Sequence, residues 1–245
     1  MEIKTIWITG ASSGIGEALA LQYAKRGYNL ILSSRRQTEL EIVATACKAI
    51  GGNCFILPFD LSDVKDASAI VKEAIAFSGK IDILLNNGGI SQRGLASETK
   101  IEVVRKIMEV NFFGQVAISS ALLPEFVKAG SGQFVVLSSL TGKFGFGLRS
   151  SYAASKHALH GYFESLAIEN FKYNVHVTMI CPGRILTNIS KNAVSADGKL
   201  YGKTDEGQKN GISAEECAIQ IVNAVDKKKR EVLICLLYTS PSPRD

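Results

Sequence analysis

Short apolar runs alternate with longer amphipathic stretches along this chain. Several of the runs are continuously apolar, which is typical of strands buried on both faces of a sheet. The predicted strands are 3–9, 29–34, 53–59, 81–86, 133–139, 174–181 and 231–235. The predicted helices are 14–26, 37–50, 64–78, 99–129 (with a break near Asn111), 151–171 and 213–227. Strands that alternate with helices predict an α/β fold, a doubly wound parallel sheet of about seven strands with helices on both faces.

Two segments do not follow this alternation. Residues 186–212 are polar and punctuated by glycine, and such a long connection predicts a lid over a functional site, mobile without ligand. Residues 236–245 carry two prolines in three residues and no periodicity, so we expect an atypical, non-native tail. The chain shows no internal repeat and no linker, and residues 1–235 are therefore predicted to form a single domain.

Composition and charge narrow the class of protein. Of the 245 residues, 46% are hydrophobic and 21% are charged, which excludes wholesale disorder. No apolar run approaches the ~20 residues of a spanning helix, and an apolar run begins almost at once at the amino end, so we expect neither a membrane span nor a signal peptide. The net charge is +5, but the one dense basic block, Lys227-Lys228-Lys229-Arg230, is more typical of a solvated helix end than of a nucleic-acid site. Five cysteines without a Cys-x-x-Cys pair indicate reduced thiols and favour a cytoplasmic location.

A glycine-rich turn joins the first predicted strand to the first predicted helix. Its sequence is Thr9-Gly10-Ala11-Ser12-Ser13-Gly14-Ile15-Gly16. The glycines permit a tight turn and a close approach of a pyrophosphate to the backbone, while the helix amino terminus offers free N–H groups and a positive dipole end. Its place between a strand and a helix favours a dinucleotide site over a merely tight turn, which is the alternative.

Tyr152 and Lys156 are candidates for proton transfer. They lie four residues apart in a predicted helix, so their side chains share one face. A free phenol titrates near pH ~10, and a neighbouring ammonium favours the phenolate, so we expect the pKa of Tyr152 to be lowered toward the working range. Ser139 ends a predicted strand, where its hydroxyl could bind a substrate oxygen. The Tyr-x-x-x-Lys spacing is nonspecific alone, but it becomes specific in combination with Asn111, Ser139 and the glycine-rich turn.

Three histidines are candidates for a metal site. His157 and His160 lie three residues apart on the same predicted helix as Lys156, but no third ligand or carboxylate is suggested near them. We therefore expect no metal, and a packing or surface position for these two and for His176.

The end of the second predicted strand bears on the choice of nicotinamide cofactor. An NAD-preferring site usually has a carboxylate here for the ribose 2′-hydroxyl, whereas this chain has Ser34. The guanidinium of Arg35 can bind a 2′-phosphate through charge-assisted hydrogen bonds, so NADP(H) is preferred over NAD(H). The alternative is that Arg35 and Arg36 merely begin a solvated helix.

These motifs together resemble the short-chain dehydrogenase/reductase family, single-domain type. The matching residues are Thr9–Gly16, Asn86-Asn87-Gly88-Gly89, Asn111, Ser139, Tyr152-x-x-x-Lys156 and Pro182-Gly183, in order between about residue 3 and about residue 235. The phrases at 90–94 (ISQRG), 110–114 (VNFFG) and 155–163 (SKHALHGYF) are most similar to the member 7B-like branch of that family. Gly88 departs from the family, which usually has alanine there, and the loss of one methyl group should be tolerated.

The resemblance implies a Rossmann-like, three-layer α/β/α fold and an NADP-dependent oxidoreductase acting on the CH–OH group of a small molecule, a carbonyl reductase or alcohol dehydrogenase. Tyr152 would donate or accept the proton, and Asn111 would start a water-mediated relay to Lys156. The cofactor would contact Gly10, Ser12, Ser13, Gly14, Ile15, Gly16, Arg35, Asp60, Leu61, Asn87, Gly88, Gly89, Tyr152, Lys156, Ile185 and Thr187. The resemblance also implies a homodimer or homotetramer built on the helices 99–129 and 151–171.

Other functions stay open from the sequence. A catalytically silent NADPH-sensing regulatory protein would keep the fold and the cofactor, but it would not need the proton-transfer residues. A sugar epimerase or dehydratase of the extended type would share Tyr-x-x-x-Lys, but such enzymes use a second domain to hold nucleotide-sugars. The substrate itself is not readable, and lipid-like and small carbonyls both fit. The residues expected to line its approach are Gln92, Arg93, Phe144, Phe146, Leu148 and Arg149.

Overall fold

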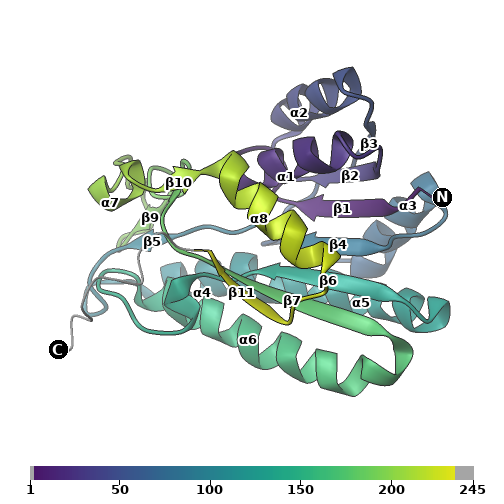
Figure 1. The fold of residues 1–245 in the computed structure, drawn as a ribbon. Coiled ribbons are helices and arrows are strands. Elements are labelled where there is room, and N and C mark those ends of the chain that lie inside the picture. The colour runs from purple at the N-terminus through teal and green to yellow at the C-terminus, as the bar shows by residue number, and fades with distance from the viewer. Residues whose placement is uncertain (1–2, 235–245) are drawn as a thin grey trace.

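A parallel sheet of seven strands runs through the middle of the structure, a computed structural model that describes residues 3–234 (Figure 1). Its strand order is β11-β7-β6-β4-β1-β2-β3, and every neighbouring pair is parallel. The strands are β1 (Thr5–Thr9), β2 (Asn29–Ser33), β3 (Asn53–Ile56), β4 (Ile83–Asn86), β6 (Gly132–Leu137), β7 (Val175–Pro182) and β11 (Glu231–Ile234). The predicted fold class is confirmed.

Helices cover both faces of this sheet, as Figure 1 shows. One layer comprises α1 (Gly14–Ala24), α2 (Gln37–Ala49) and α8 (Ala214–Asp226), and the other comprises α3 (Ala67–Ser78), α4 (Ile101–Met108), α5 (Gly114–Ala129) and α6 (Ser150–Asn170). The alternation of side chains along β1 explains why its three central residues are all apolar. Ile6 and Ile8 pack into the first layer, whereas Trp7 packs into the second, and all three are fully buried.

The predicted boundaries differ from the observed ones by a few residues. The predicted strand 53–59 ends at Ile56, and the predicted helix 64–78 begins at Ala67. The helix begins there because the carboxylate of Asp66 accepts a hydrogen bond from the backbone N–H of Ala69 at 2.9 Å. The predicted tail 236–245 and Cys235 lie outside the described residues.

The predicted break near Asn111 is present as a wider turn. The chain stays helical from α4 to α5, and the five residues Glu109–Phe113 between them form a π-helix.

By length and composition alone, the helical stretch Ile101–Ala129 could cross a membrane, which the sequence pattern did not predict. In the structure 44% of its most apolar window is buried inside the domain, as in the core helix of many proteins, so this is weak evidence.

The order of the strands places a crevice at the edge where β1 and β4 end. From β1 the chain proceeds to β2 and β3 on one side, and from β4 it proceeds to β6, β7 and β11 on the other. The connections that follow two neighbouring strands therefore leave in opposite directions. Ligands bind at such a switch point in doubly wound folds.

The long polar connection carries more structure than its sequence indicates. It contains β8 (Ile185–Leu186), β9 (Val194–Ser195), α7 (Glu206–Lys209) and β10 (Ile212–Ser213). β8 pairs with β10, and β9 pairs with β5 (Gln92–Arg93), which follows β4. These pairs are only two residues long, so periodicity could not reveal them.

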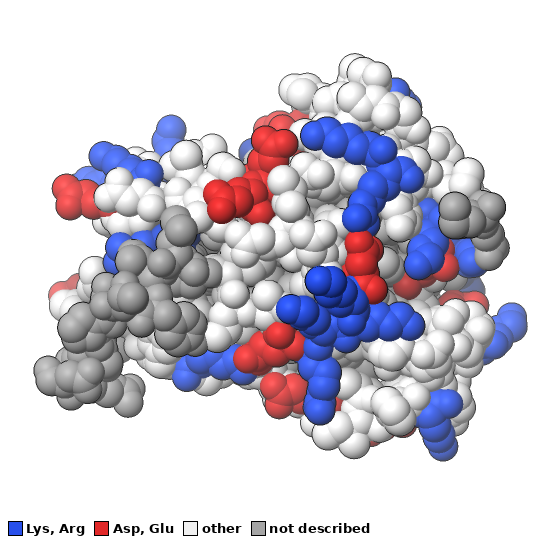
Figure 2. All heavy atoms as spheres, in the orientation of Figure 1, with Lys and Arg blue, Asp and Glu red and all other residues white. Residues whose placement is uncertain are grey.

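The basic block at the end of α8 is exposed to solvent, as expected. Lys227, Lys228, Lys229 and Arg230 are all exposed. Figure 2 shows basic and acidic side chains mixed on this face of the molecule. Arg26, which follows α1, pairs with Asp226 of α8 at 2.9 Å. A mixed surface of this kind gives no support to a nucleic-acid site, whose absence stays a prediction.

Candidate active site

The glycine-rich turn holds the ends of β1 and β4 together through backbone contacts. Gly10 has a φ of +66°, in the left-handed region, and a Cβ at this position would lie 2.7 Å from the Cα of Gly88. A Cβ on Gly16 would overlap the carbonyl oxygen of Gly10. Only glycine at these two positions permits α1 to begin so close to both strand ends.

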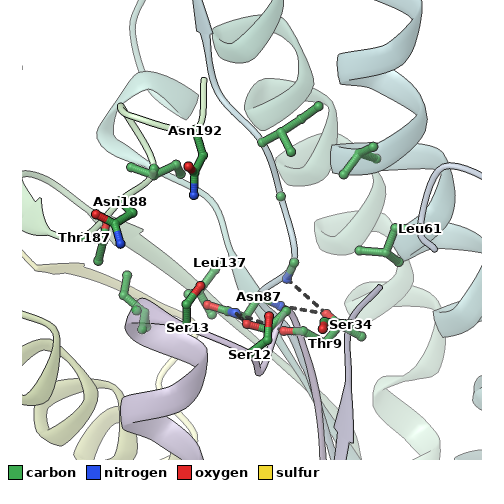
Figure 3. Close-up of a pocket in the computed structure, with 18 of the residues that line it drawn as sticks. Thr9, Ser12, Ser13, Ser34, Leu61, Asn87, Leu137, Thr187, Asn188 and Asn192 are labelled. Carbon is green, nitrogen blue, oxygen red and sulfur yellow. Dashed lines mark hydrogen bonds between the residues drawn. The ribbon is translucent and has the colours of Figure 1, made fainter. Parts of the chain in front are cut away.

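Side-chain hydrogen bonds fasten the same junction (Figure 3). The hydroxyl oxygen of Thr9 accepts bonds from the backbone N–H groups of Asn87 and Gly88, both at 3.1 Å. In return, the side-chain amide of Asn87 donates to the carbonyl oxygens of Thr9 at 2.9 Å and Gly10 at 3.1 Å. Asn87 is thus a structural clamp as well as part of the predicted ribose contact.

A cleft of about 510 Å³ opens above this junction. All the predicted site residues line it except Gly16, which supports the turn from behind, and Asn111. Figure 3 shows Thr187, Asn188 and Asn192 across the cleft from Leu61. Asn188, Asn192 and Gln208 also line it, although no motif in the sequence pointed to them. The side-chain amide of Gln208 donates to the carbonyl oxygen of Ile185 at 2.7 Å, which ties α7 to the predicted nicotinamide contact.

The two arginines after β2 lie differently in the cleft. Arg36 reaches the glycine-rich turn, where its guanidinium donates to the hydroxyls of Ser12 at 2.8 Å and Ser13 at 2.9 Å. Arg35 pairs loosely with Asp60 at 3.8 Å. Both line the cleft, but only Arg35 was assigned to the cofactor from the sequence. Arg36 is the neighbour of Arg35 in the sequence, which made it a candidate for the cofactor. The direction in which a side chain points at the start of a helix, however, is not readable from the sequence.

Tyr152, Ser139 and Lys156 meet at one end of the cleft, where α6 passes the end of β6. Lys156 is 3% exposed, its ammonium donates to the carbonyl oxygen of Leu137 at 2.6 Å, and it lies 5.7 Å from the centre of the Tyr152 ring. Burial lowers the pKa of Lys156 to about 8. The Ser139 hydroxyl acts to lower the pKa of the Tyr152 phenol.

The pKa of Tyr152 departs from the expectation. Burial raises it above its ordinary value, and this outweighs the lowering by the hydrogen bond with Ser139 and by the positive charges of Arg149 and Arg93. The predicted lowering was wrong because the sequence pattern does not show how deeply the phenol is buried.

Asn111 lies in the π-turn and is completely buried. Its carbonyl oxygen accepts from the backbone N–H of Ile90 at 2.8 Å, and its amide donates to the Ile90 carbonyl at 2.9 Å and to the Ser155 hydroxyl at 3.0 Å. These hydrogen bonds give Asn111 a structural role between the segment that follows β4 and α6. The water-mediated relay to Lys156 stays a prediction.

A second cavity of about 180 Å³ adjoins the first and shares Ser139 and Tyr152 with it. Of the residues expected to line the substrate approach, Arg93, Phe146 and Arg149 do so. Gln92 instead lies buried, where it donates to Thr99 at 2.7 Å and accepts from the backbone N–H of Ser151 at 3.0 Å. Phe144 and Leu148 are exposed outside this cavity.

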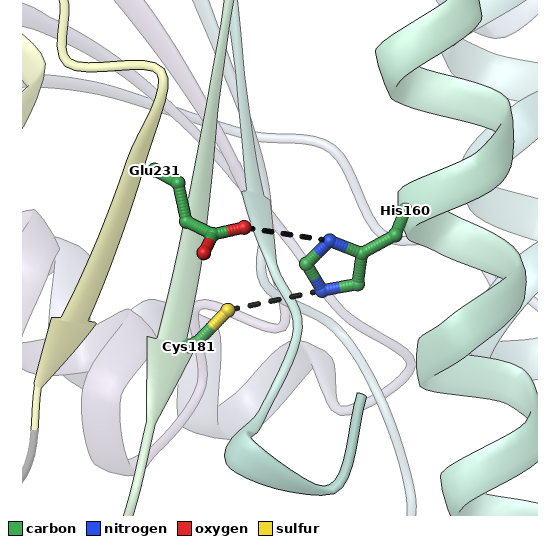
Figure 4. Close-up of side chains that lie close together, drawn as sticks. All are labelled: His160, Cys181 and Glu231. Atoms are coloured by element: carbon green, nitrogen blue, oxygen red, sulfur yellow. Dashed lines mark hydrogen bonds and ion pairs between the residues drawn. The ribbon is translucent and has the colours of Figure 1, made fainter. Parts of the chain in front are cut away.

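His160 lies close to a cysteine and a carboxylate that the sequence did not suggest (Figure 4). Cys181 of β7 approaches its Nε2 at 3.7 Å, and Glu231 of β11 approaches its Nδ1 at 3.7 Å. The ammonium of Lys143 lies in the same place, because it pairs with Glu231 and contacts Nδ1 at 3.3 Å. Burial and the Lys143 charge lower the pKa of His160, so the lysine supplies the positive charge. Among the described residues, one ligand atom from each of His160, Cys181 and Glu231 lies within 4.8 Å of the other two, but the Lys143 ammonium already pairs with Glu231 and contacts His160. The absence of a metal stays a prediction.

Comparison with known proteins agrees with this geometry. Residues 4–198 match the sequence model of the short chain dehydrogenase family. The chain is 41% identical over 234 residues to the dehydrogenase/reductase SDR family member 7B of Mus musculus, covering 93% of this chain and 72% of the relative. It is 42% identical over 236 residues to a dehydrogenase/reductase SDR family protein 7-like of Anopheles gambiae, covering 94% and 74%. The resemblance to the family and to its member 7B branch is confirmed.

Solved structures resemble the fold over nearly its whole length. An alcohol dehydrogenase from the archaeon Thermococcus sibiricus, complexed with 5-hydroxy-NADP, superposes with a TM-score of 0.84 at 26% identity, covering 98% of this chain and 100% of that one. A short-chain dehydrogenase from Sphingobium yanoikuyae, in complex with NADPH, superposes with a TM-score of 0.81 at 26% identity, covering 94% and 87%. With the family match over most of its length, and with the glycine-rich turn and the Tyr152–Lys156 pair at one cleft, the chain belongs to the short-chain dehydrogenase/reductase family.

Proposed function

We propose that the chain is an NADP(H)-dependent oxidoreductase that interconverts a carbonyl and a primary or secondary alcohol. The observation that carries this proposal is the meeting of the two cavities at Tyr152 and Ser139. One cavity has the backbone turn suited to a dinucleotide, the other has room for a small molecule, and the two hydroxyls lie between them.

The residues of the larger cleft fit a nicotinamide dinucleotide. Gly10 and Gly16 have no side chain where the backbones of the turn and of β4 meet, which leaves N–H groups at the start of α1 free for a pyrophosphate. Asp60, Leu61 and the residues from Asn87 to Gly89 would hold the adenosine half. Ile185 and Thr187 would hold the nicotinamide half, where the cofactor supplies or accepts hydride when bound.

A preference for NADP(H) is supported by the charges at the end of β2. Ser34 stands where a carboxylate would select NAD(H), and the guanidinium groups of Arg35 and Arg36 border the same end of the cleft. Two of the similar solved structures contain NADP forms. The preference is tested by titrating NADPH and NADH into wild type, Arg36→Gln and Arg35→Gln. We expect Arg36→Gln to weaken NADPH about tenfold and NADH little. Equal affinity of wild type for the two cofactors would contradict the preference.

The chain's own groups can move the proton. The hydroxyl of Tyr152 donates its proton to the carbonyl oxygen during reduction and takes it back during oxidation, while the Ser139 hydroxyl donates a second hydrogen bond to that oxygen. Because burial raises the pKa of Tyr152, the phenol keeps its proton at neutral pH, as an acid for reduction requires. Lys156 places a positive charge near the phenol ring without leaving the core.

Absorbance of NADPH in the presence of aldehydes, ketones and quinones tests this function directly. Tyr152→Phe should retain NADPH binding and lose turnover by a factor of about 10² to 10⁴, the usual contribution of a general acid. Tyr162→Phe is the matched control, because this second tyrosine of α6 is hydrogen-bonded to Ser120 on the helix surface. If wild type binds NADPH but reduces no carbonyl, the silent NADPH-sensing protein of the same fold becomes the better interpretation.

We also propose a homodimer or homotetramer built on α5 and α6. Phe113, the last residue of the π-helix before α5, and Ile168 on α6 are 49% and 71% exposed, which is high for apolar side chains. Light scattering at micromolar concentration tests this association, and a monomer mass would contradict it. The cytoplasmic location stays a prediction.

A further inference from the structure

The smaller cavity beside Tyr152 is unusually rich in arginine. Arg93, Arg149 and Arg184 line it together with one carboxylate, that of Asp205. They come from β5, from the residue before α6, from the turn before β8 and from the residue before α7. Three guanidinium groups against one carboxylate leave this side of the active site positively charged.

Arg93 is already satisfied by its protein partners. It is 7% exposed, and one terminal nitrogen donates to the Ser91 hydroxyl at 2.7 Å and to the Gln92 carbonyl oxygen at 2.6 Å. Its Nε donates to Asp205 at 3.0 Å, and its second terminal nitrogen also binds that carboxylate. Asp205 therefore neutralises Arg93 through a bidentate ion pair.

Arg149 keeps donors for a ligand. Within residues 3–234 its guanidinium has one hydrogen bond, from Nη2 to Asp205 at 2.8 Å, and it lies 4.7 Å from the centre of the Phe146 ring. That ring holds the guanidinium plane without using its N–H groups. Since Asp205 is shared with Arg93, the charge of Arg149 is only partly compensated, at the wall of a cavity that also contains the Tyr152 and Ser139 hydroxyls.

We propose, on the basis of the carbonyl reduction proposed above, that the substrate carries an anionic group, a carboxylate or a phosphate monoester, which binds Arg149 beside the reacting carbonyl. A guanidinium fork matches such anions with two parallel hydrogen bonds. The cavity of about 180 Å³ holds only a small group, so the anion and the carbonyl are separated by a few bonds. The alternative is that these charges serve only to hold the segment around Asp205 in place. That structural role would require the ion pair with Arg93, but it would not require Arg149 and Arg184.

The experiment compares matched substrates that differ only in charge. One pair is a short oxo-carboxylate and its primary amide, and the other is a ketone phosphate monoester and the parent hydroxy ketone. Wild type should show a kcat/KM at least about tenfold higher for the anionic member of one pair, the fold-change typical of a hydrogen bond to a charged group. Comparison of the two pairs distinguishes a carboxylate from a phosphate.

Two variants and a control locate the effect. Arg149→Gln should reduce the anion-to-amide ratio to about one, and Arg149→Lys, which keeps the charge but not the fork, should give an intermediate ratio. Arg105→Gln removes the same charge from the exposed surface of α4 and should keep the wild-type ratio. Thermal unfolding and NADPH binding verify that each variant is folded.

Direct binding separates this proposal from the proposed function. Calorimetric titration of the corresponding hydroxy acid and hydroxy amide, with NADPH present, measures the charge preference without turnover, because the reduced cofactor cannot accept hydride from an alcohol. If neutral carbonyls are reduced but neither binding nor kcat/KM favours the anion, the anion site is wrong and the reductase stands. If no carbonyl is reduced but the hydroxy acid binds through Arg149, the anion site stands and the proposed reaction fails. An unchanged ratio in Arg149→Gln overturns the anion site.

Discussion

The two halves of the active site are built in different ways. The nucleotide half is made by backbone from neighbouring residues, since Thr9 to Gly16 form one continuous turn and clasp the end of β4. The substrate half is made by charged side chains from segments far apart, and Arg93 and Asp205 are separated by 112 positions in the chain. Backbone turns need particular residues at fixed spacing, whereas an ion-paired wall needs only that distant segments arrive at the same place.

This difference indicates which half of the active site tolerates amino-acid substitution. A turn in which a Cβ would overlap backbone atoms has little room to relax, because the nearest contact of a Cβ at Gly10 or at Gly16 is a main-chain atom. In a wall made of side chains, substitution of one charged residue by another can change which substrate binds, and the strands β1, β4 and β6 need not change.

Gly16→Ala probes the rigid half and should have the largest effect. The new methyl group would overlap the Gly10 carbonyl oxygen, so α1 must move away from the turn, and we expect NADPH affinity to fall about 30- to 100-fold. Gly161→Ala is the matched control, because no atom lies within 4 Å of a Cβ at this exposed position of α6. The control should bind NADPH normally and gain about 0.5–1 kcal/mol of stability from its helix propensity. An affinity within threefold of wild type in Gly16→Ala would show that the turn can relax after all.

Lys156 lies where the two halves meet, and its burial predicts a pH dependence of stability. Its pKa is about 8 in the folded protein and 10.5 as a free side chain, so between these values the unfolded state binds the extra proton. Stability must therefore rise with pH across this window, by up to ~1.4 kcal/mol per pH unit, and the gain is lost as the pH falls to 8.

Urea unfolding of wild type and Lys156→Met at several pH values between 8 and 10.5 isolates this contribution. The other tyrosines, lysines and cysteines titrate in both proteins, so the difference between the two free energies of unfolding should rise with pH. A constant difference would mean that the Lys156 ammonium remains charged in the core.

Asp205→Asn probes the substrate half. The change leaves Arg93 buried with no full countercharge, and we expect the amide hydrogens of 205–213 to exchange roughly tenfold faster, after allowance for solvent screening of this partly exposed pair. The pKa of Asp205 supports this, since Arg93 and Arg149 lower it even though burial acts to raise it. Asp226→Asn, which removes the surface pair with Arg26, should leave exchange in this segment unchanged.

The same measurement in wild type tests whether 188–212 acts as a lid. Exchange there should slow when NADPH and a substrate analogue are added, because α7 and β10 contact Ile185 and Arg184 next to the cleft.

If the amide hydrogens of 205–213 exchange as slowly in Asp205→Asn as in wild type, the ion pair between Asp205 and Arg93 does not hold that segment in place.

Gly88→Ala should have the smallest effect, although it lies in the rigid half. A Cβ at Gly88 would come within 2.5 Å of the Cδ1 methyl of Leu61, and that methyl is the end of a flexible side chain rather than backbone. We expect NADPH affinity to change less than about threefold and stability to change by less than ~1.5 kcal/mol, as for other tolerated core changes. A tenfold loss of affinity, measured by fluorescence titration, would mean that Leu61 cannot turn aside.

Much of the nucleotide half could be predicted from the sequence because its signals are local. The spacing of Gly10, Gly14 and Gly16 after an apolar run encodes the turn, and Tyr152 and Lys156 share a helix face through the period of the α-helix. The deep burial of Tyr152 was not predictable in this way. It depends on how α6 packs against β7 and the turn that follows β6, and it reverses the expected direction of the pKa shift.

By itself, the sequence determined the alternation of strands and helices, the position of the glycine-rich turn and the residues that end each strand at the cleft, because each follows from periodicity or spacing over a few residues. Only the tertiary structure decided that Arg36 reaches Ser12, that Lys143 fills the space beside His160, and that Asp205 joins Arg93 and Arg149. The physical reason is that each of these contacts joins a charged side chain to a partner from another element of the fold. Such a contact requires no residue pattern on either partner until the packing of the sheet and helices brings the two together.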